Sequence, residues 1–73
     1  MDVSKQLQRA EDEIRAERGH MDRQEKFIDA LGQGGHETGQ AERSLGIMQR
    51  SLAAFDHHRR ILLERLGLYR PPD

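Results

Sequence analysis

The side chains best suited to chemistry in this chain are two pairs of metal-binding residues. Glu17 and His20 have E-x-x-H spacing, which places a carboxylate and an imidazole on one face of a helix. His57 and His58 follow in the second half, where a returning helix would carry them to about the same height. Di-iron bundles take such motifs from several helices, whereas this chain has one, so we predict no metal site and no cofactor. The alternative interpretation is a metal-binding helical bundle that uses Glu17, His20, His57 and His58.

The glycine-rich segment LGQGGHETGQAE could be a phosphate loop, a metal-binding turn or a chain reversal. A dinucleotide-binding loop follows a strand and carries a third glycine at the position of Glu37, and neither condition is met. Gly32, Gly34 and Gly35 can adopt the left-handed conformation that ends a helix. Thr38 can then accept a backbone hydrogen bond as the next helix begins. The segment is therefore predicted to be a hairpin turn.

Two apolar stripes with alternating steps of four and three residues predict the elements that position these side chains. The first stripe contains Val3, Leu7, Ala10, Ile14, Met21, Ile28 and Leu31, with Glu17 and Gln24 in its polar places. The second contains Ala41, Leu45, Met48, Leu52, Phe55, Leu62, Leu66 and Tyr69, with Arg59 in its polar place. The predicted core and interaction residues are Leu7, Ile14, Met21, Ile28, Leu45, Met48, Leu52, Phe55, Leu62 and Leu66.

The predicted fold is all-α, a hairpin of two long antiparallel helices that forms a single domain over residues 1–73. We expect a helix over about 3–32, a turn over about 33–38, a second helix over about 39–68 and a short tail at 69–73. Asp2 or Ser4 can cap the first helix, and Pro71 and Pro72 are expected to stop the second. Gly19 and Gly46 lie inside the helices, where each marks either a close helix approach or a tolerated defect.

The charged residues mostly predict solvated helix faces. Three pairs have the favourable four-residue spacing: Glu11 with Arg15, Asp22 with Lys26, and Asp56 with Arg60. Glu17 and Arg59 differ from these because they occupy polar places within the apolar stripes. We expect the hairpin to bring these two charges within about a turn of each other, where a partly buried pair would fix helix alignment or oligomeric state.

Composition excludes several classes of protein. The chain has 73 residues and a formal net charge of −1, so no overall positive field attracts nucleic acid or an anionic membrane. Its longest apolar runs are too short to span a bilayer, and its polar beginning does not resemble a signal peptide. It contains no cysteine, which fits a cytoplasmic protein. No serine, histidine and acid pattern for nucleophilic catalysis can be singled out, so we expect no enzymatic activity.

Several short segments resemble those of small bacterial helical-hairpin proteins, common in alphaproteobacteria and uncharacterised in function. The matching residues are Glu17-Arg18, Arg23-Gln24, Gly35-His36-Glu37-Thr38, Ala41-Glu42, Leu45, Leu52 and His58-Arg59. The likeness covers about residues 14–67 and departs at Phe55, where such sequences often carry another histidine. The resemblance implies a hairpin and a bacterial cytoplasmic protein, and it implies no catalytic residue.

A lone pair of helices leaves one flank of each stripe exposed to water. Phe27, Ile47, Ile61, Leu63 and Leu68 lie outside the stripes and widen the apolar face. We therefore expect a twofold homodimer that forms a four-helix bundle. The predicted function is a small protein-interaction or regulatory module that acts through this face. The third interpretation is a small accessory subunit that docks on a larger protein partner.

Overall fold

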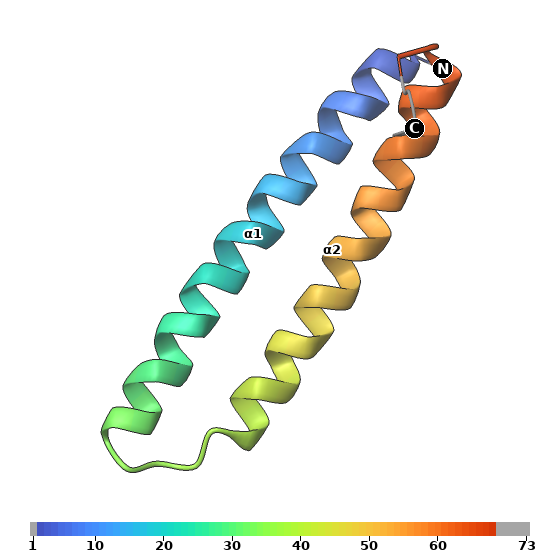
Figure 1. The fold of residues 1–73 in the computed structure, drawn as a ribbon. Helices are drawn as coiled ribbons and strands as arrows, with labels where there is room; N and C mark the ends of the chain where they lie inside the picture. Colours follow the sequence, from blue (N-terminus) through green and yellow to red (C-terminus); the bar gives the residue numbers. More distant parts are fainter. Residues whose placement is uncertain (1, 69–73) are drawn as a thin grey trace.

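The structure is a hairpin of two long helices that pack against each other (Figure 1). It is a computed structural model that describes residues 2–68. Helix α1 covers Val3–Gln33 and helix α2 covers Gly39–Arg65, with no strand among the described residues. The extents are 50 × 28 × 14 Å, so the molecule is one helix thick. This confirms the predicted all-helical hairpin. Within residues 2–68, no helix combines the length and the apolar character needed to cross a membrane.

Helix α1 begins at a side-chain cap. The Asp2 carboxylate accepts hydrogen bonds from the backbone N–H groups of Ser4, at 2.9 Å, and Lys5, at 3.4 Å. These N–H groups belong to the first turn, where no helical carbonyl is available to accept from them. Of the two caps that the sequence allows, the structure therefore uses Asp2.

Helix α1 ends in a Schellman motif that depends on one glycine. Gly35 has φ +76°, while Gly34 at the helix end has φ −81°. The N–H of His36 donates to the Leu31 carbonyl at 2.9 Å, and the N–H of Gly35 donates to the Gly32 carbonyl at 3.1 Å. These bonds satisfy carbonyls that the helix leaves free at its end. The predicted reversal is present, and Gly35 is the residue of the segment that takes the left-handed conformation.

The start of α2 differs from the prediction for Thr38. Its hydroxyl donates to the Glu42 carboxylate at 3.2 Å and does not accept a backbone N–H. The helix still begins here, because the Thr38 carbonyl accepts from the Glu42 N–H at 2.8 Å. Thr38 has ψ −4°, whereas a side-chain cap usually has extended backbone, and this explains why its hydroxyl does not reach the first turn.

Helix α2 ends at Arg65, three residues earlier than predicted, in a second Schellman motif. Gly67 has φ +72° and donates to the Glu64 carbonyl at 3.0 Å. The Leu68 N–H donates to the Leu63 carbonyl at 2.9 Å. Gly67 was not among the predicted stops, although a glycine after an apolar stripe is a common helix stop. The stop expected from Pro71 and Pro72 lies outside the described residues, as does Tyr69.

The predicted stripes form the seam between the helices. Among the described residues every stripe position is at least partly buried, including the polar Glu17, Gln24 and Arg59. Among the described residues the buried side chains are Ala10, Ile14, Ala41 and Leu62, and of these Leu62 is fully buried. Ile14 and Leu62 were predicted core residues, and the other eight of that set (Leu7, Met21, Ile28, Leu45, Met48, Leu52, Phe55 and Leu66) are partly buried. The seam between the helices is therefore buried at a few residues and partly exposed to solvent at the others.

Contacts between the helices fix their register. Near the turn, the Gln24 side-chain amide donates to the Ala41 carbonyl at 3.0 Å, the one side-chain hydrogen bond within residues 2–68 that joins the helices. Towards the free ends, His58 of α2 borders a groove with residues 6–13 of α1. Every helical residue adds about 1.5 Å, so these points place all the other seam residues relative to one another.

Candidate interaction surface

The register separates the four side chains that could have formed a metal site. His58 lines a groove with Gln6, Arg9, Ala10 and Glu13. His20 lies seven residues beyond Glu13, about 10 Å further along α1. The expectation that these histidines share a height is therefore wrong. In the part of the chain that the structure describes, no three His, Cys, Asp or Glu side chains gather as a metal-binding group.

The exposure of the histidines also differs from that of a built metal or catalytic centre. His20, His36, His57 and His58 are all exposed to solvent, and Glu17 is partly buried. Metal ligands and catalytic groups are normally held in position by packing and by second hydrogen bonds. None of the hydrogen bonds found between described side chains involves one of these histidines. The described histidines therefore lack the packing and the hydrogen bonds that hold ligands or catalytic groups in position.

The predicted pair of Glu17 and Arg59 is not formed. Arg59 lines a groove with Glu11, Ile14, Arg15, Arg18 and Asp56. Glu17 does not line this groove, although its neighbour Arg18 does. The ion pairs of residues 2–68 join other partners. Spacing along the chain shows which positions of the seam are polar, but it does not show which residues face each other across the seam.

The groove around Arg59 belongs to a densely charged face of the hairpin. Its lining combines three guanidinium groups with the carboxylates of Glu11 and Asp56, so charges of both signs lie close together. Asp56 also forms an ion pair with Arg60 at 3.2 Å. Mixed charges at this spacing keep a helix surface solvated and favour no single class of ligand.

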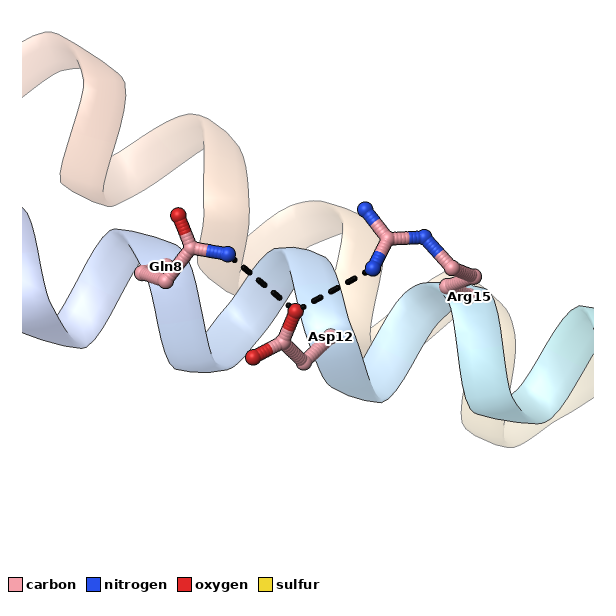
Figure 2. Close-up of polar contacts among 3 residues, drawn as sticks. All are labelled: Gln8, Asp12 and Arg15. Carbon is pink, nitrogen blue, oxygen red and sulfur yellow. Dashed lines mark hydrogen bonds and ion pairs between the residues drawn. The ribbon is translucent and has the colours of Figure 1, made fainter.

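Figure 2 shows polar contacts among three residues of α1. The Asp12 carboxylate accepts from the Gln8 side-chain amide at 3.2 Å and from the Arg15 guanidinium at 3.3 Å. Arg15 was predicted to pair with Glu11, and it uses the carboxylate three residues away instead. The predicted pairs of Asp22 with Lys26 and of Asp56 with Arg60 are present, each at 3.2 Å.

Apolar side chains outside the seam lie on the remaining surface. Phe27 is 53% exposed, Ile47 57% and Leu68 66%. Ile61 and Leu63, the two other residues expected to widen the apolar face, are partly buried. Leu63 and Leu68 occupy the two positions of the Schellman motif that usually make an apolar contact. Their side chains are therefore suited to stabilising the end of α2.

Two of these residues, Ile47 and Ile61, form with Ala54 a row along α2 that was not among the predicted features. Ile47, Ala54 and Ile61 recur every seven residues, so they share one line on the helix surface. We call these three residues the outer row. The seam residues Met48, Phe55 and Leu62 follow them by one position each. This seven-residue repeat is present in the sequence, but each of its residues lies next to a seam residue, and the seam pattern is the stronger of the two.

Neither internal glycine marks a close approach between the helices. A Cβ atom added at Gly46 would meet nothing within 4 Å. One added at Gly19 would lie 3.5 Å from the guanidinium of Arg23, on the same helix. Of the two explanations that the sequence left open, the structure favours a tolerated defect at both positions.

Comparisons with known proteins identify no relative of the chain: no protein-family model, no curated protein and no solved structure matches it.

Proposed function

We propose that this chain is a small, non-enzymatic protein-interaction module that acts as a homodimer through an apolar helical face. The two hairpins would stack about a twofold axis to form a four-helix bundle. This is a common way for a pair of amphipathic helices to complete its core. A regulatory role would follow if dimerisation created or covered the surface that a further partner binds.

The observation that carries this proposal is the large surface of the isolated hairpin. The chain exposes 5781 Å². A compact monomer of its mass, 8.4 kDa, is expected to expose about 4,600 Å². The excess is roughly 1,200 Å², comparable with the roughly 800 Å² that each partner contributes to a standard protein interface. Burial of this excess against a second copy would give the small core the apolar contacts that it lacks.

The composition of the exposed surface supports the same proposal. Phe27 and Ile47 are large apolar side chains, and each is more than half exposed. Large apolar side chains that lie together on a water-exposed surface commonly mark an interaction site. The four histidines, the side chains best suited to acid–base chemistry, are instead all exposed to solvent. An activity based on surface contact therefore fits the chain better than one based on an enclosed site.

Sedimentation equilibrium of the purified, untagged chain tests the proposal. The expected result is a mass of twice 8.4 kDa, with dissociation to the single chain on dilution. Far-ultraviolet circular dichroism on the same samples would show that the helices persist or are lost with dissociation. A helical monomer at every concentration would overturn the homodimer and favour a small accessory subunit of a larger complex.

A further inference from the structure

We propose that the face of the hairpin that carries Ile47 binds an acidic amphipathic helix of another protein. In this contact the partner's apolar side chains lie against the outer row, and its carboxylates pair with the arginines that border the row. The inference goes beyond the proposed homodimer, because it names a second occupant of the same face and a way to regulate dimerisation. It does not require the homodimer, because a single chain presents the same face.

Two grooves between the helices open on this face. One groove is lined by Glu13 and His58, and the other, near the turn, by Phe27 and Ser44. Glu13 and Phe27 are two heptads apart, as are Ser44 and His58, so both grooves follow the same side of the two helices. The outer row begins at Ile47, one turn after Ser44, and therefore lies on this side too. We call the side with the two grooves and the outer row the outer-row face.

Five arginines border the outer-row face. Arg9 lines one of the grooves, and Arg23 lies two heptads after it on the same row of α1. On α2, Arg43 and Arg50 each lie one turn before a residue of the outer row, and Arg65 lies one heptad after the groove histidine. All five are exposed, and none belongs to an ion pair formed within residues 2–68. The face therefore presents guanidinium groups that a partner can pair.

Carboxylates are fewer on the outer-row face. Glu13 and Glu37 line the grooves, and Glu64 lies beside the outer row. Asp2, on the row of Arg9, is engaged in capping α1. No ion pair among the described residues joins one of these carboxylates to an arginine of the face. An excess of positive charge therefore remains beside the exposed apolar side chains.

The opposite face has the reverse balance of charge. It contains the groove around Arg59, which Glu11, Arg18 and Asp56 also line. The heptad rows that continue from this groove add only carboxylates: Asp22, Glu25, Asp29 and Glu42. An acidic partner is therefore repelled by these rows and attracted to the outer-row face.

A helix is the partner structure that matches both kinds of residue at once. Ile47 is 57% exposed and Phe27 53%, so a partner can bury apolar surface on this face. An amphipathic helix that lies along the hairpin presents apolar side chains every three or four residues, and its flanks can carry carboxylates to the arginines on either side. Arginine–carboxylate contacts at the rim select the charge of the partner, while the apolar contact supplies affinity.

The same charges predict how the two occupants of the face compete. A second copy brings its own arginines to the contact, so like charges weaken the homodimer there, whereas an acidic helix meets opposite charge. Salt screens both effects. Raising the salt concentration should therefore tighten the homodimer and weaken the complex with the acidic helix. Because one face cannot hold both, binding of the partner should dissociate the homodimer.

A designed peptide of about 20 residues serves as the probe, with leucine at the apolar positions of each heptad and glutamate on both flanks. Its dissociation constant, measured by fluorescence anisotropy, should rise about tenfold or more between about 50 mM and about 500 mM salt. Two matched peptides, one with lysine in place of glutamate and one with serine in place of leucine, should bind at least about tenfold more weakly. Sedimentation equilibrium with the glutamate peptide should show loss of the homodimer.

Charge reversals locate the binding surface. Arg23→Glu and Arg50→Glu should each raise the dissociation constant of the glutamate peptide about fivefold or more. Arg18→Glu is the matched control, because Arg18 is an exposed arginine of the opposite face and the change in net charge is the same. It should leave the dissociation constant within about twofold of that of the unmodified chain. Circular dichroism establishes that the three variants keep their helices.

The outcomes separate this inference from the proposed homodimer. Equal effects of Arg18→Glu and Arg23→Glu, or equal binding of the glutamate and lysine peptides, would overturn the outer-row face as an acidic docking surface. Tighter binding of poly(U) RNA or of phosphatidylserine vesicles than of the glutamate peptide would overturn a protein partner and assign the arginines to nucleic acid or membrane. A monomeric chain that binds the glutamate peptide would remove the homodimer alone, and a dimer that does not bind it would remove this inference alone.

Discussion

At the scale of single residues, conformation and place in the register decide what each side chain does. Gly35 is required for its left-handed backbone, whereas Gly46 lies in a regular helix with open space where a Cβ would stand. A glycine is therefore required at position 35 and is not required at position 46. The same holds for polar places in the seam, since Gln24 bonds across to α2 and Glu17 does not pair with Arg59.

The two glycines predict opposite effects of alanine. Gly46→Ala should stabilise the protein by roughly 0.8–1.0 kcal/mol, because alanine loses less backbone entropy in a helix and nothing obstructs its methyl group. Gly35→Ala should destabilise it by about 1–2 kcal/mol, because φ +76° is unfavourable for a residue with a Cβ. Urea unfolding at one protein concentration measures both. Equal shifts in the same direction would contradict this assignment of the turn.

Glu17 and Arg59, the charged residues of the seam, are predicted to make independent contributions to the free energy of unfolding. Glu17→Gln, Arg59→Met and the double variant form a cycle measured by denaturant unfolding at neutral pH. Because the register keeps the two groups apart, their effects should add to within about 0.3–0.5 kcal/mol. A coupling energy of about 1 kcal/mol or more would show that the two side chains meet, within a chain or between copies.

At the scale of the helices, stability depends on one apolar line and on the ends of each element. The seam buries Ala10, Ile14, Ala41 and Leu62, and every other described seam residue keeps some contact with water. Helix α1 gains a capping carboxylate and α2 gains an ordered stop at Gly67. Each of these features contributes about 1 kcal/mol, so no single one determines the hairpin.

Leu62 is predicted to be the most sensitive apolar position of α2. Its side chain is fully buried, and Leu62→Ala should cost about 2–5 kcal/mol through lost contacts and the cavity left behind. This is a large part of the stability of so small a core. Gln49→Ala, at an exposed position of the same helix, should change stability by less than about 0.5 kcal/mol. Equal melting of the two variants would remove Leu62 from the core.

The hydrogen bond between the helices gives a prediction about register. Gln24→Met keeps a similar volume but removes the donor to the Ala41 carbonyl, and it should cost about 0.5–1.5 kcal/mol. Gln8→Met is the control, since the Gln8 amide bonds only to Asp12 on the exposed side of α1. Thermal unfolding of the two variants compares them. A smaller loss at Gln24 than at Gln8 would mean that this bond does not hold the helices together.

At the scale of the whole molecule, the hairpin is a thin plate with two unlike faces. It is 14 Å in its shortest dimension, so both faces are open to solvent before any partner binds. One face carries the mixed charges around Asp56 and Arg59, and Ile47 is exposed elsewhere on α2. This asymmetry is the reason for placing the second copy of the proposed homodimer on the face that carries Ile47.

Association predicts that thermal stability depends on concentration. If folding and dimerisation are coupled, the midpoint of unfolding should rise with protein concentration, by roughly 10 °C over a hundredfold range. Ile47→Asp should flatten this dependence while Gln49→Asp preserves it. A midpoint independent of concentration in the unmodified chain would argue for a monomer that is stable by itself.

The sequence by itself determined the helices, the reversal and the residues of the seam. Steps of four and three residues bring side chains to one face of any α-helix, so Leu7, Met21 and Leu52 could be assigned to the seam without coordinates. Only the tertiary structure decided which residues lie opposite one another. Register depends on the geometry of the turn and on contacts such as that of Gln24 with Ala41. Local spacing does not encode these contacts, which is the reason that the sequence predicts Glu17 beside Arg59 and His20 level with His58 whereas the structure has neither.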